Sequence, residues 1–214
     1  MKYKSRAISL TYIKQGESSI ISKILTEEKG LQTFIVKGVR SKNSKKKLSY
    51  FEPLKLLNIN ASFNTKQSLQ YLGDITVGAN FEIKTNKIHK SFIGFFVAEV
   101  SSKVLQENEQ NNLLFNFIWD TTSKLYNCEK PDPNFALKYL LNLSQFLGFY
   151  PSSAEINNLF FNLESGEFCN KINSPKMCLD QEKTSYLKNL LNNNAVIIPQ
   201  EQKSELLKDL LYYY

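Results

Sequence analysis

Apolar and polar residues alternate through about the first 80 positions of the chain. Residues 5–13 carry apolar side chains at Ile8, Leu10 and then Tyr12 or Ile13, close to the every-second-residue spacing of a half-buried strand. Similar short segments, separated by turn-forming residues, predict further strands at 20–26, 31–38, 54–61 and 69–77. Five short strands in this length favour a small barrel, and the five-stranded OB-fold is one such architecture.

From residue 88 onward the apolar spacing changes to three and four residues, which is typical of amphipathic helices. Helices are predicted at 88–106, 113–125, 133–147, 181–192 and 200–211. Asp132 followed by Pro133 marks the start of the third of these, and Gly148 marks its end. We expect the first helix to bury the face that carries Phe92, Phe95, Phe96, Val100 and Val104.

A short segment between the helices differs from both patterns. The sequence FFNLESGEF at 160–168 predicts a hairpin, and the polar stretch 169–178, which contains Pro175, predicts a loop. The fold class is therefore α+β, with an N-terminal five-stranded OB-fold barrel followed by an all-α helical domain that has a small hairpin and loop insertion. We expect a basic OB-fold at 1–80 and the helical domain at 81–214, with the insertion at about 160–180.

Charge divides the chain near the same place. The 214 residues include 27 Lys and Arg and 20 Asp and Glu, a net charge of +7. Residues 1–90 hold 17 cationic and 6 acidic residues, a net charge of +11, whereas residues 91–214 hold 10 and 14, a net charge of −4. A basic half attracts polyanions, and nucleic acid is the usual candidate. A solvated lysine-rich surface is the alternative interpretation.

Several function classes lack the residues that they need. The cysteines are Cys128, Cys169 and Cys178, none in a C-x-x-C pair, and His89 is the only histidine, so the four ligands of a structural zinc site are missing. A single histidine in a polar stretch disfavours a Ser-His-Asp or Cys-His enzyme, and the P-loop pattern is absent. No apolar run approaches the ~18 residues of a membrane span, and no signal segment follows the basic start, so we expect a cytoplasmic protein without catalytic activity.

The densest cationic segment, at 40–47, follows the third predicted strand. Five of its eight residues are cationic, and neutralising phosphates with such residues gives affinity without sequence specificity. The predicted nucleic-acid-binding residues are Lys37, Arg40, Lys42, Lys45, Lys46 and Lys47. Candidate platforms for stacking unpaired bases are Tyr12, Phe34, Tyr50, Phe51 and Tyr71, with packing in the barrel core as the alternative for each.

Glu99 is an isolated carboxylate within an apolar stretch of the first predicted helix. A buried carboxylate needs a partner. We therefore expect Glu99 to pair with Arg6 or Arg40 and so to join the two halves of the chain.

Several of these segments, taken in order, resemble the RecO family of bacterial recombination mediators. The segments are GESSII at 16–21, TEEKG at 26–30, VKGVR at 36–40, FEPL at 51–54, AEV at 98–100, NLLF at 112–115, PNFAL at 133–137, FLGFYP at 146–151 and FNLESGEF at 161–168. Each segment alone is weakly specific, but their order and spacing together are fairly specific. The resemblance extends from residue 1 to about residue 168.

The resemblance implies an OB-fold joined to a helical domain and a non-enzymatic role in DNA repair and recombination. RecO-like proteins bind single- and double-stranded DNA and anneal complementary strands. Their partners are RecR and single-strand-binding protein, whose acidic tail we expect to dock in an apolar groove near Lys124, Lys138 or Lys188. RecA is an indirect partner, which such proteins help to load on DNA. The expected location is the bacterial cytoplasm, at the nucleoid.

One departure from the family concerns metal. Many members carry four cysteines after the Leu-Gly-aromatic-Pro segment, but this region keeps only Cys169 and Cys178. We therefore expect no zinc and no other cofactor, and one zinc per chain in a metal analysis would overturn this. Two other functions remain open from the residues alone. One is a general OB-type RNA-binding module, and the other is a non-enzymatic scaffold whose basic half meets an acidic protein.

Overall fold

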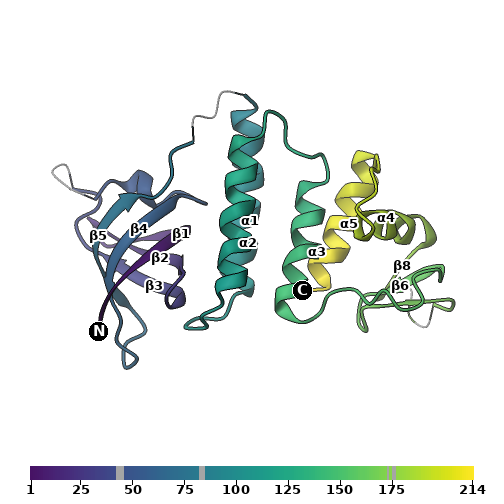
Figure 1. The fold of residues 1–214 in the computed structure, drawn as a ribbon, viewed down its shortest axis with the longest axis horizontal. Helices are drawn as coiled ribbons and strands as arrows, with labels where there is room; N and C mark the ends of the chain where they lie inside the picture. The colour runs from purple at the N-terminus through teal and green to yellow at the C-terminus, as the bar shows by residue number, and fades with distance from the viewer. Residues whose placement is uncertain (42–45, 82–84, 173, 175–176) are drawn as a thin grey trace. The chain divides into compact units, whose positions relative to one another are not determined.

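The computed structural model describes residues 1–41, 46–81, 85–172, 174 and 177–214. The chain forms two compact units, Met1–Pro131 and Asp132–Tyr214. The first unit contains the strands of a barrel and two helices, and the second contains three helices and a small sheet (Figure 1).

The first unit begins with a closed five-stranded barrel. Its strands are β1 (Lys2–Gln15), β2 (Ser19–Thr26), β3 (Gly30–Val36), β4 (Leu56–Ser62) and β5 (Gln70–Val77), in the order β1-β2-β3-β5-β4. β1 pairs with both β2 and β4, and the only parallel pair among the described strands joins β3 to β5. A short 3-10 helix, η1 (Leu48–Phe51), precedes β4. The predicted OB-fold barrel followed by a helical region is confirmed.

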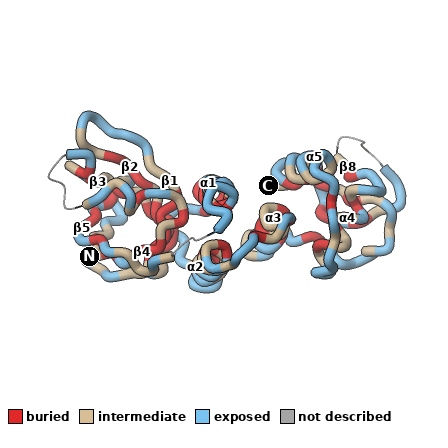
Figure 2. The backbone as a smooth tube through the Cα atoms, turned by 90° about the horizontal axis from the view of Figure 1, so that it is seen from above, coloured by how far each residue is buried: buried red, intermediate tan, exposed pale blue. Residues whose placement is uncertain are grey.

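Alternation along the strands builds the barrel core, as expected of sheets with one buried face. Inward residues such as Ile20, Ile24 and Phe34 are fully buried and pack with Leu57 and Ile59 of β4. Figure 2 shows buried residues along the strands of the barrel and also on the helices. The outward side chains of β1, β4 and β5 are polar or charged along most of their length, so this face is open to solvent or a ligand.

The helices α1 (Lys87–Val104) and α2 (Asn112–Asn127) pack against each other and complete the first unit (Figure 1). The predicted buried face of α1 is wrong in part, because Phe92 is 69% and Phe95 56% exposed. The buried face instead carries Ile93, Gly94, Val97, Ala98, Ser101 and Ser102, together with Val100 and Lys90. Small residues on this face allow a close approach, since a Cβ at Gly94 would lie 2.7 Å from the Tyr126 hydroxyl of α2.

The end of α1 and the connection between α1 and α2 lie against β2 and β3 of the barrel. Lys23 Nζ donates a hydrogen bond to the Ser102 carbonyl, and Thr33 Oγ1 donates to Glu107 Oε1 at 2.7 Å. Lys23 and Thr33 are register partners on neighbouring strands, so both outward side chains of this row are used in the contact. Part of the outer β2–β3 face is therefore covered by the protein's own chain.

Arg6 of β1 makes a second contact between the barrel and the helices. Its guanidinium forms a forked ion pair with Glu27, at 2.6 and 2.9 Å, and donates to Asn116 Oδ1 of α2 at 2.9 Å. It also lies over the ring of Trp119, 4.9 Å from the centroid. The expectation that Arg6 or Arg40 pairs with a buried Glu99 is wrong, because Glu99 is exposed and pairs with Lys103 one turn along α1.

We predict that Arg6→Ala lowers the free energy of unfolding of the first unit by about 1–2 kcal/mol, since it removes a forked ion pair and a cation–π contact. Arg6 lowers the pKa of Glu27 below its ordinary value of 4.5. The stabilisation from this pair is therefore present above the ordinary pKa and lost as pH falls through the lowered one. Urea unfolding followed by the fluorescence of Trp119, the only tryptophan, measures both effects. Equal acid sensitivity in wild type and Arg6→Ala would contradict this assignment.

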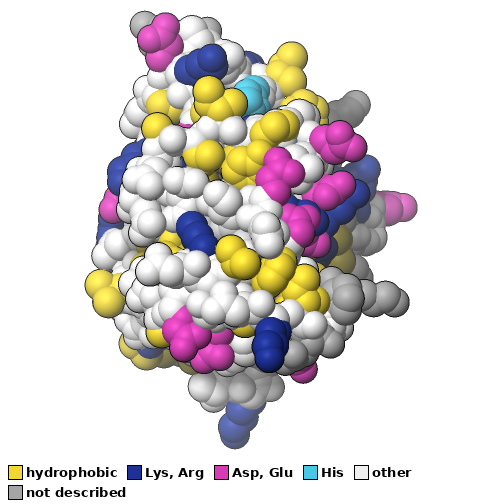
Figure 3. Space-filling view, turned by 90° about the vertical axis from the view of Figure 1, so that its right-hand side faces the viewer, with side chains coloured by type: hydrophobic (Ala, Val, Ile, Leu, Met, Phe, Trp, Pro, Cys, Tyr) yellow, Lys and Arg dark blue, Asp and Glu magenta, His cyan; other side chains and the backbone are white. Residues whose placement is uncertain are grey.

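The second unit is built on three helices, α3 (Phe135–Leu147), α4 (Gln181–Leu191) and α5 (Gln200–Tyr212). The N-cap of the third helix is Asn134, two residues after the predicted Asp132 cap, and Gly148 ends the helix in the left-handed conformation. The predicted hairpin is confirmed as β6 (Phe160–Asn162) and β7 (Glu167–Cys169), with β8 (Cys178–Leu179) on the other side of β6. The unit has seven Lys against nine Asp and Glu. On the face of the molecule that Figure 3 shows, acidic and cationic side chains are interspersed.

Candidate nucleic-acid interface

The cationic residues predicted to bind nucleic acid lie after β3. Lys42 and Lys45 fall outside the described residues, so four of the six can be located. Lys37, Arg40 and Lys47 are exposed, and Lys46 is half-buried. The contacts of Lys37, Lys46 and Arg40 show that these side chains reach two different parts of the barrel.

Lys37 and Lys46 both reach the beginning of β5. Lys37 Nζ lies 5.9 Å from the centroid of the Tyr71 ring, and Lys46 Nζ donates a 2.6 Å hydrogen bond to the neighbouring Leu72 carbonyl. Burial lowers the pKa of Lys46, and the nearby Asp74 carboxylate partly opposes this. Lys46 therefore ties its segment to β5, while Lys37 places a cation beside an exposed aromatic ring.

Arg40 contacts the turn between β1 and β2. Its side chain donates to the Gly16 carbonyl at 3.0 Å, and its backbone N–H donates to the Ser18 carbonyl. Arg40 therefore ties its segment to the β1–β2 turn, at a different place from Lys37.

The structure separates the five candidate stacking residues. Phe34 and Phe51 are fully buried in the core, so they are not available to bases. Tyr12 and Tyr50 are partly buried and pack against the same core. Tyr71 is 51% exposed on the outer side of β5, and it has the surface that stacking requires.

Two further cations on the barrel were not among the predicted site residues. Lys2 and Lys4 are exposed on the first half of β1, on the same face as Arg6, because side chains two positions apart share one face of a strand. The predicted strand began at residue 5 and so left them out. The repeated cation at every second position, Lys2, Lys4 and Arg6, was the available signal.

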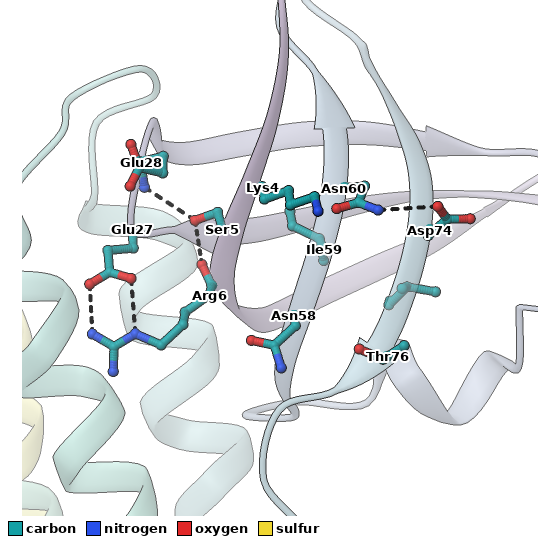
Figure 4. Close-up of a pocket in the computed structure, with 11 residues that line it drawn as sticks. Lys4, Ser5, Arg6, Glu27, Glu28, Asn58, Ile59, Asn60, Asp74 and Thr76 are labelled. Atoms are coloured by element: carbon teal, nitrogen blue, oxygen red, sulfur yellow. Dashed lines mark hydrogen bonds and ion pairs between the residues drawn. The ribbon is translucent and has the colours of Figure 1, made fainter.

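The outer face of β1, β4 and β5 is hollowed beside these cations. One depression of about 430 Å³ is lined by Lys4, Arg6 and Asn58, and a second of about 600 Å³ is lined by Lys2, Tyr71 and Ser62. In Figure 4, Lys4, Asn60 and Asp74 come from three neighbouring strands, and Asn60 Nδ2 donates to Asp74 Oδ2 at 3.1 Å. The face offers cations, amides, a carboxylate and an aromatic ring to a ligand.

The remaining candidates for metal or catalytic chemistry lie apart from this face. Among the described residues no cluster of three or more His, Cys, Asp or Glu side chains could hold a metal ion. Cys169 lies on β7 and Cys178 on β8. Burial is the main cause that raises the pKa of the Cys169 thiol, and the neighbouring Cys178 raises it further. His89 is exposed on α1. The absence of zinc stays a prediction.

None of the described helices is long and apolar enough to cross a membrane. The closed five-stranded barrel, its exposed cations and the helices that follow it define the architecture of an OB-fold protein with a basic barrel and a helical region.

Comparison with known proteins identifies the family. The family model described as "Recombination protein O N terminal" matches residues 1–81, and the one described as "Recombination protein O C terminal" matches residues 85–214. The chain belongs to the RecO family, and its role lies in DNA repair and recombination.

Relatives named DNA repair protein RecO match across most or all of the chain. The protein of Flavobacterium johnsoniae is 30% identical over 219 residues, and that of Flavobacterium psychrophilum is 31% identical over 222 residues. Both alignments cover 100% of this chain and 91% of the relative. The protein of Azobacteroides pseudotrichonymphae is 32% identical over 169 residues, which cover 78% of this chain and 70% of the relative.

Proposed function

We propose that the protein is a recombination mediator that binds single- and double-stranded DNA, anneals complementary strands and helps to load RecA on DNA coated with single-strand-binding protein. The observation that carries the proposal is the cationic surface of a barrel in a chain of the RecO family, formed by Lys2 and Lys4 on β1 and by Lys37, Arg40 and Lys47 after β3. The proposal assigns no catalytic residue and no cofactor. We propose a cytoplasmic location at the nucleoid, where its DNA substrate lies.

Charge neutralisation is the physical basis of the proposed annealing. Two complementary strands repel each other through their phosphates, and a protein that neutralises phosphates with Lys and Arg releases the bound counterions. Residues 37–47 contribute six cations for this purpose: Lys37, Arg40, Lys42, Lys45, Lys46 and Lys47. Lys46 acts mainly by fixing the segment to β5 through the Leu72 carbonyl. The other five are proposed to contact phosphates.

The domain division proposed for this function is an OB-fold at 1–80 that binds DNA and a helical region at 81–214 that binds proteins. The acidic and apolar tail of single-strand-binding protein is proposed to dock in a groove of about 480 Å³ lined by Phe81, Phe95 and Tyr126. The cations Lys55 and Lys87 also line this groove, together with the carboxylate of Glu52. Two of the three lysines first considered have other roles, since Lys138 pairs with Asp132 and Lys188 donates to the Asn158 carbonyl. RecR is proposed as a partner on the strength of family membership alone.

Annealing of complementary oligonucleotides coated with the cognate single-strand-binding protein tests the proposal. We expect annealing by the wild type and a loss of at least about tenfold in rate for the triple variant Lys42→Gln, Lys45→Gln, Lys47→Gln, since it removes three of the cations that neutralise phosphate. The matched control changes Lys103, Lys130 and Lys208, exposed lysines outside the barrel, to Gln.

The possible outcomes separate the function from the location of the site. If the wild type does not anneal DNA or bind it in a salt-dependent manner, the mediator proposal fails and a scaffold role is favoured. If RNA of the same sequence binds more tightly than DNA, an RNA-binding module is favoured. If the triple variant and its control anneal equally well, the function stands and the contribution of residues 42–47 is disproved.

A further inference from the structure

The outer face of β1, β4 and β5 carries three rows of side chains that cross the strands. In one row Lys2 of β1 is the register partner of Ser62, which is the partner of Tyr71. In the last row Arg6 is the partner of Asn58, which is the partner of Thr76. Rows two residues apart are about 6.6 Å apart, so the three rows span about 13 Å, enough for a few nucleotides.

The middle row joins the two depressions into one groove. Lys4 of β1 is the register partner of Asn60. Lys4, Asn60 and Asp74 line both depressions, so the two adjoin each other along this row. Figure 4 shows these three side chains in a line across the strands. We call this surface the β1–β4–β5 groove.

Charge along the groove is arranged by strand. The cations Lys2 and Lys4 lie on β1, and Lys37 lies beside Tyr71 at the β5 end. Asp74 lies on β5, and the other acidic residues, Glu27 and Glu28, line the Arg6 end, where Glu27 is paired with Arg6. A phosphate backbone is therefore attracted to Lys2 and Lys4 on the β1 side of the groove and is repelled by the carboxylate of Asp74 on β5.

The side chains of Asn60 and Asp74 in the middle row, and the ring of Tyr71 on β5, can bind unpaired bases. Tyr71 is half exposed and carries a cation on one side of its ring, which leaves the ring free to stack on a base. The carboxylate of Asp74 and the amide of Asn60 can accept hydrogen bonds from the exocyclic amines of bases. In a duplex the faces of the bases are covered by stacking on their neighbours, so stacking on Tyr71 selects a single strand.

The position of the groove follows from how the barrel is covered. OB-folds commonly bind oligonucleotides on the face of strands 2 and 3. Here Lys23 and Thr33 on that face hydrogen-bond to Ser102 and Glu107. A ligand strand would have to displace these contacts, whereas Lys2, Lys4 and Tyr71 of the β1–β4–β5 groove are exposed.

We propose that the β1–β4–β5 groove binds single-stranded DNA, with its backbone along Lys2 and Lys4 and a base stacked on Tyr71. This inference rests on the proposed function and adds a second DNA site to the cations at 40–47. The two sites, on one barrel, can hold two strands at the same time.

Fluorescence anisotropy with a labelled single-stranded oligonucleotide and with the matching duplex tests the groove. Tyr71→Ala should weaken single-strand binding about tenfold with an unchanged salt slope, while Tyr71→Phe, which keeps the ring, should bind like the wild type. The double variant Lys2→Gln, Lys4→Gln should lower the salt slope on single strands by about 1.4, from about 0.7 for each lost phosphate contact. The control Lys103→Gln, Lys130→Gln has the same charge change outside the barrel.

Duplex binding separates a single-strand groove from a general electrostatic effect. We expect Tyr71→Ala to bind the duplex as the wild type does. Wild-type binding of single strands together with unchanged single-strand binding by Tyr71→Ala would overturn the groove and leave the proposed function intact. Equal losses for duplex and single strand would also overturn it, and tighter binding of an acidic peptide than of DNA would assign the groove to a protein. Failure of the wild type to bind any DNA would instead overturn the proposed function.

Discussion

Gly30→Ala is expected to lower the free energy of unfolding of the first unit by about 3 kcal/mol, the size typical of a substitution that forces backbone strain. Gly30 begins β3 with φ +64°, a conformation that costs a residue with a Cβ about 1 kcal/mol. A Cβ built there would also lie 1.9 Å from the Glu109 carbonyl oxygen of the α1–α2 connection. Backbone lies on both sides of this contact, so one of the two segments must move.

The movement would separate the barrel from the connection between its two helices. Next to Gly30, Leu31 forms a bridge with Glu107, and Gln32 Nε2 donates to Asn108 Oδ1 at 3.0 Å. These contacts depend on the close approach that Gly30 allows. We therefore expect Gly30→Ala to weaken them together, which adds about 2 kcal/mol to the backbone cost because buried polar groups lose partners.

Gly16→Ala is the matched control for this prediction. Gly16 lies in the β1–β2 turn with a similar φ of +58°, and a Cβ there would meet nothing within 4 Å. Its substitution should cost only the backbone term, about 1 kcal/mol. Urea unfolding followed by Trp119 fluorescence compares the two variants. Equal losses for Gly16→Ala and Gly30→Ala would mean that the contact with Glu109 adds nothing to stability.

The alternation of apolar and polar residues along the first 80 positions was sufficient to predict the barrel, because each strand has one face in the core. The segments 20–26 and 69–77 agree with β2 and β5 to within one residue. The start of β1 was missed because its inward residues Tyr3 and Ser5 are less apolar than the rest of the core, and its outward residues are all cations. The predicted site omitted Lys2 and Lys4 for the same reason.

The buried face of α1 could not be predicted from apolar spacing. The largest apolar side chains, Phe92 and Phe95, are exposed, and the helix packs instead through small residues such as Gly94 and Ala98. Small residues add little to a hydrophobic pattern, but they allow the close approach of a neighbouring helix. In the site, the sequence located a cationic segment at 40–47 but not the directions of its side chains. Those depend on hydrogen bonds to carbonyls such as Gly16 and Leu72, which any residue could supply.

The burial of Lys90 on α1 could likewise not be predicted from the sequence. Lys90 is 1% exposed, although lysine is almost never fully buried without a partner. Its ammonium group donates to the carbonyls of Tyr126, at 3.2 Å, and Cys128. These carbonyls lie at the C-terminal end of α2, where the last carbonyls lack partners within the helix and the helix dipole is negative. Lys90 therefore joins the start of α1 to the end of α2.

We predict that Lys90→Met lowers the free energy of unfolding of the first unit by about 2–4 kcal/mol. Methionine fills similar space but leaves both carbonyls without their charged donor, and a hydrogen bond to a charged group contributes about 1.5–3 kcal/mol. The position of Lys90 in the first turn of α1 offsets part of this, because a cation there is unfavourable by about 0.3–1 kcal/mol. The gain at α2 is larger than this cost, so the net effect of Lys90 is stabilising.

Lys103→Met on the same helix is the control for the loss of a lysine. The Lys103 side chain is 70% exposed and pairs with Glu99, so its loss should change the free energy of unfolding by less than about 1 kcal/mol. Trp119 lies on α2, so its fluorescence during urea unfolding reports on the unit that contains both lysines. If Lys90→Met were as stable as Lys103→Met, water would have to satisfy the two carbonyls, and the buried ammonium would not be the link between α1 and α2. A loss of several kcal/mol in Lys90→Met alone would assign that link to a single hydrogen-bonded cation.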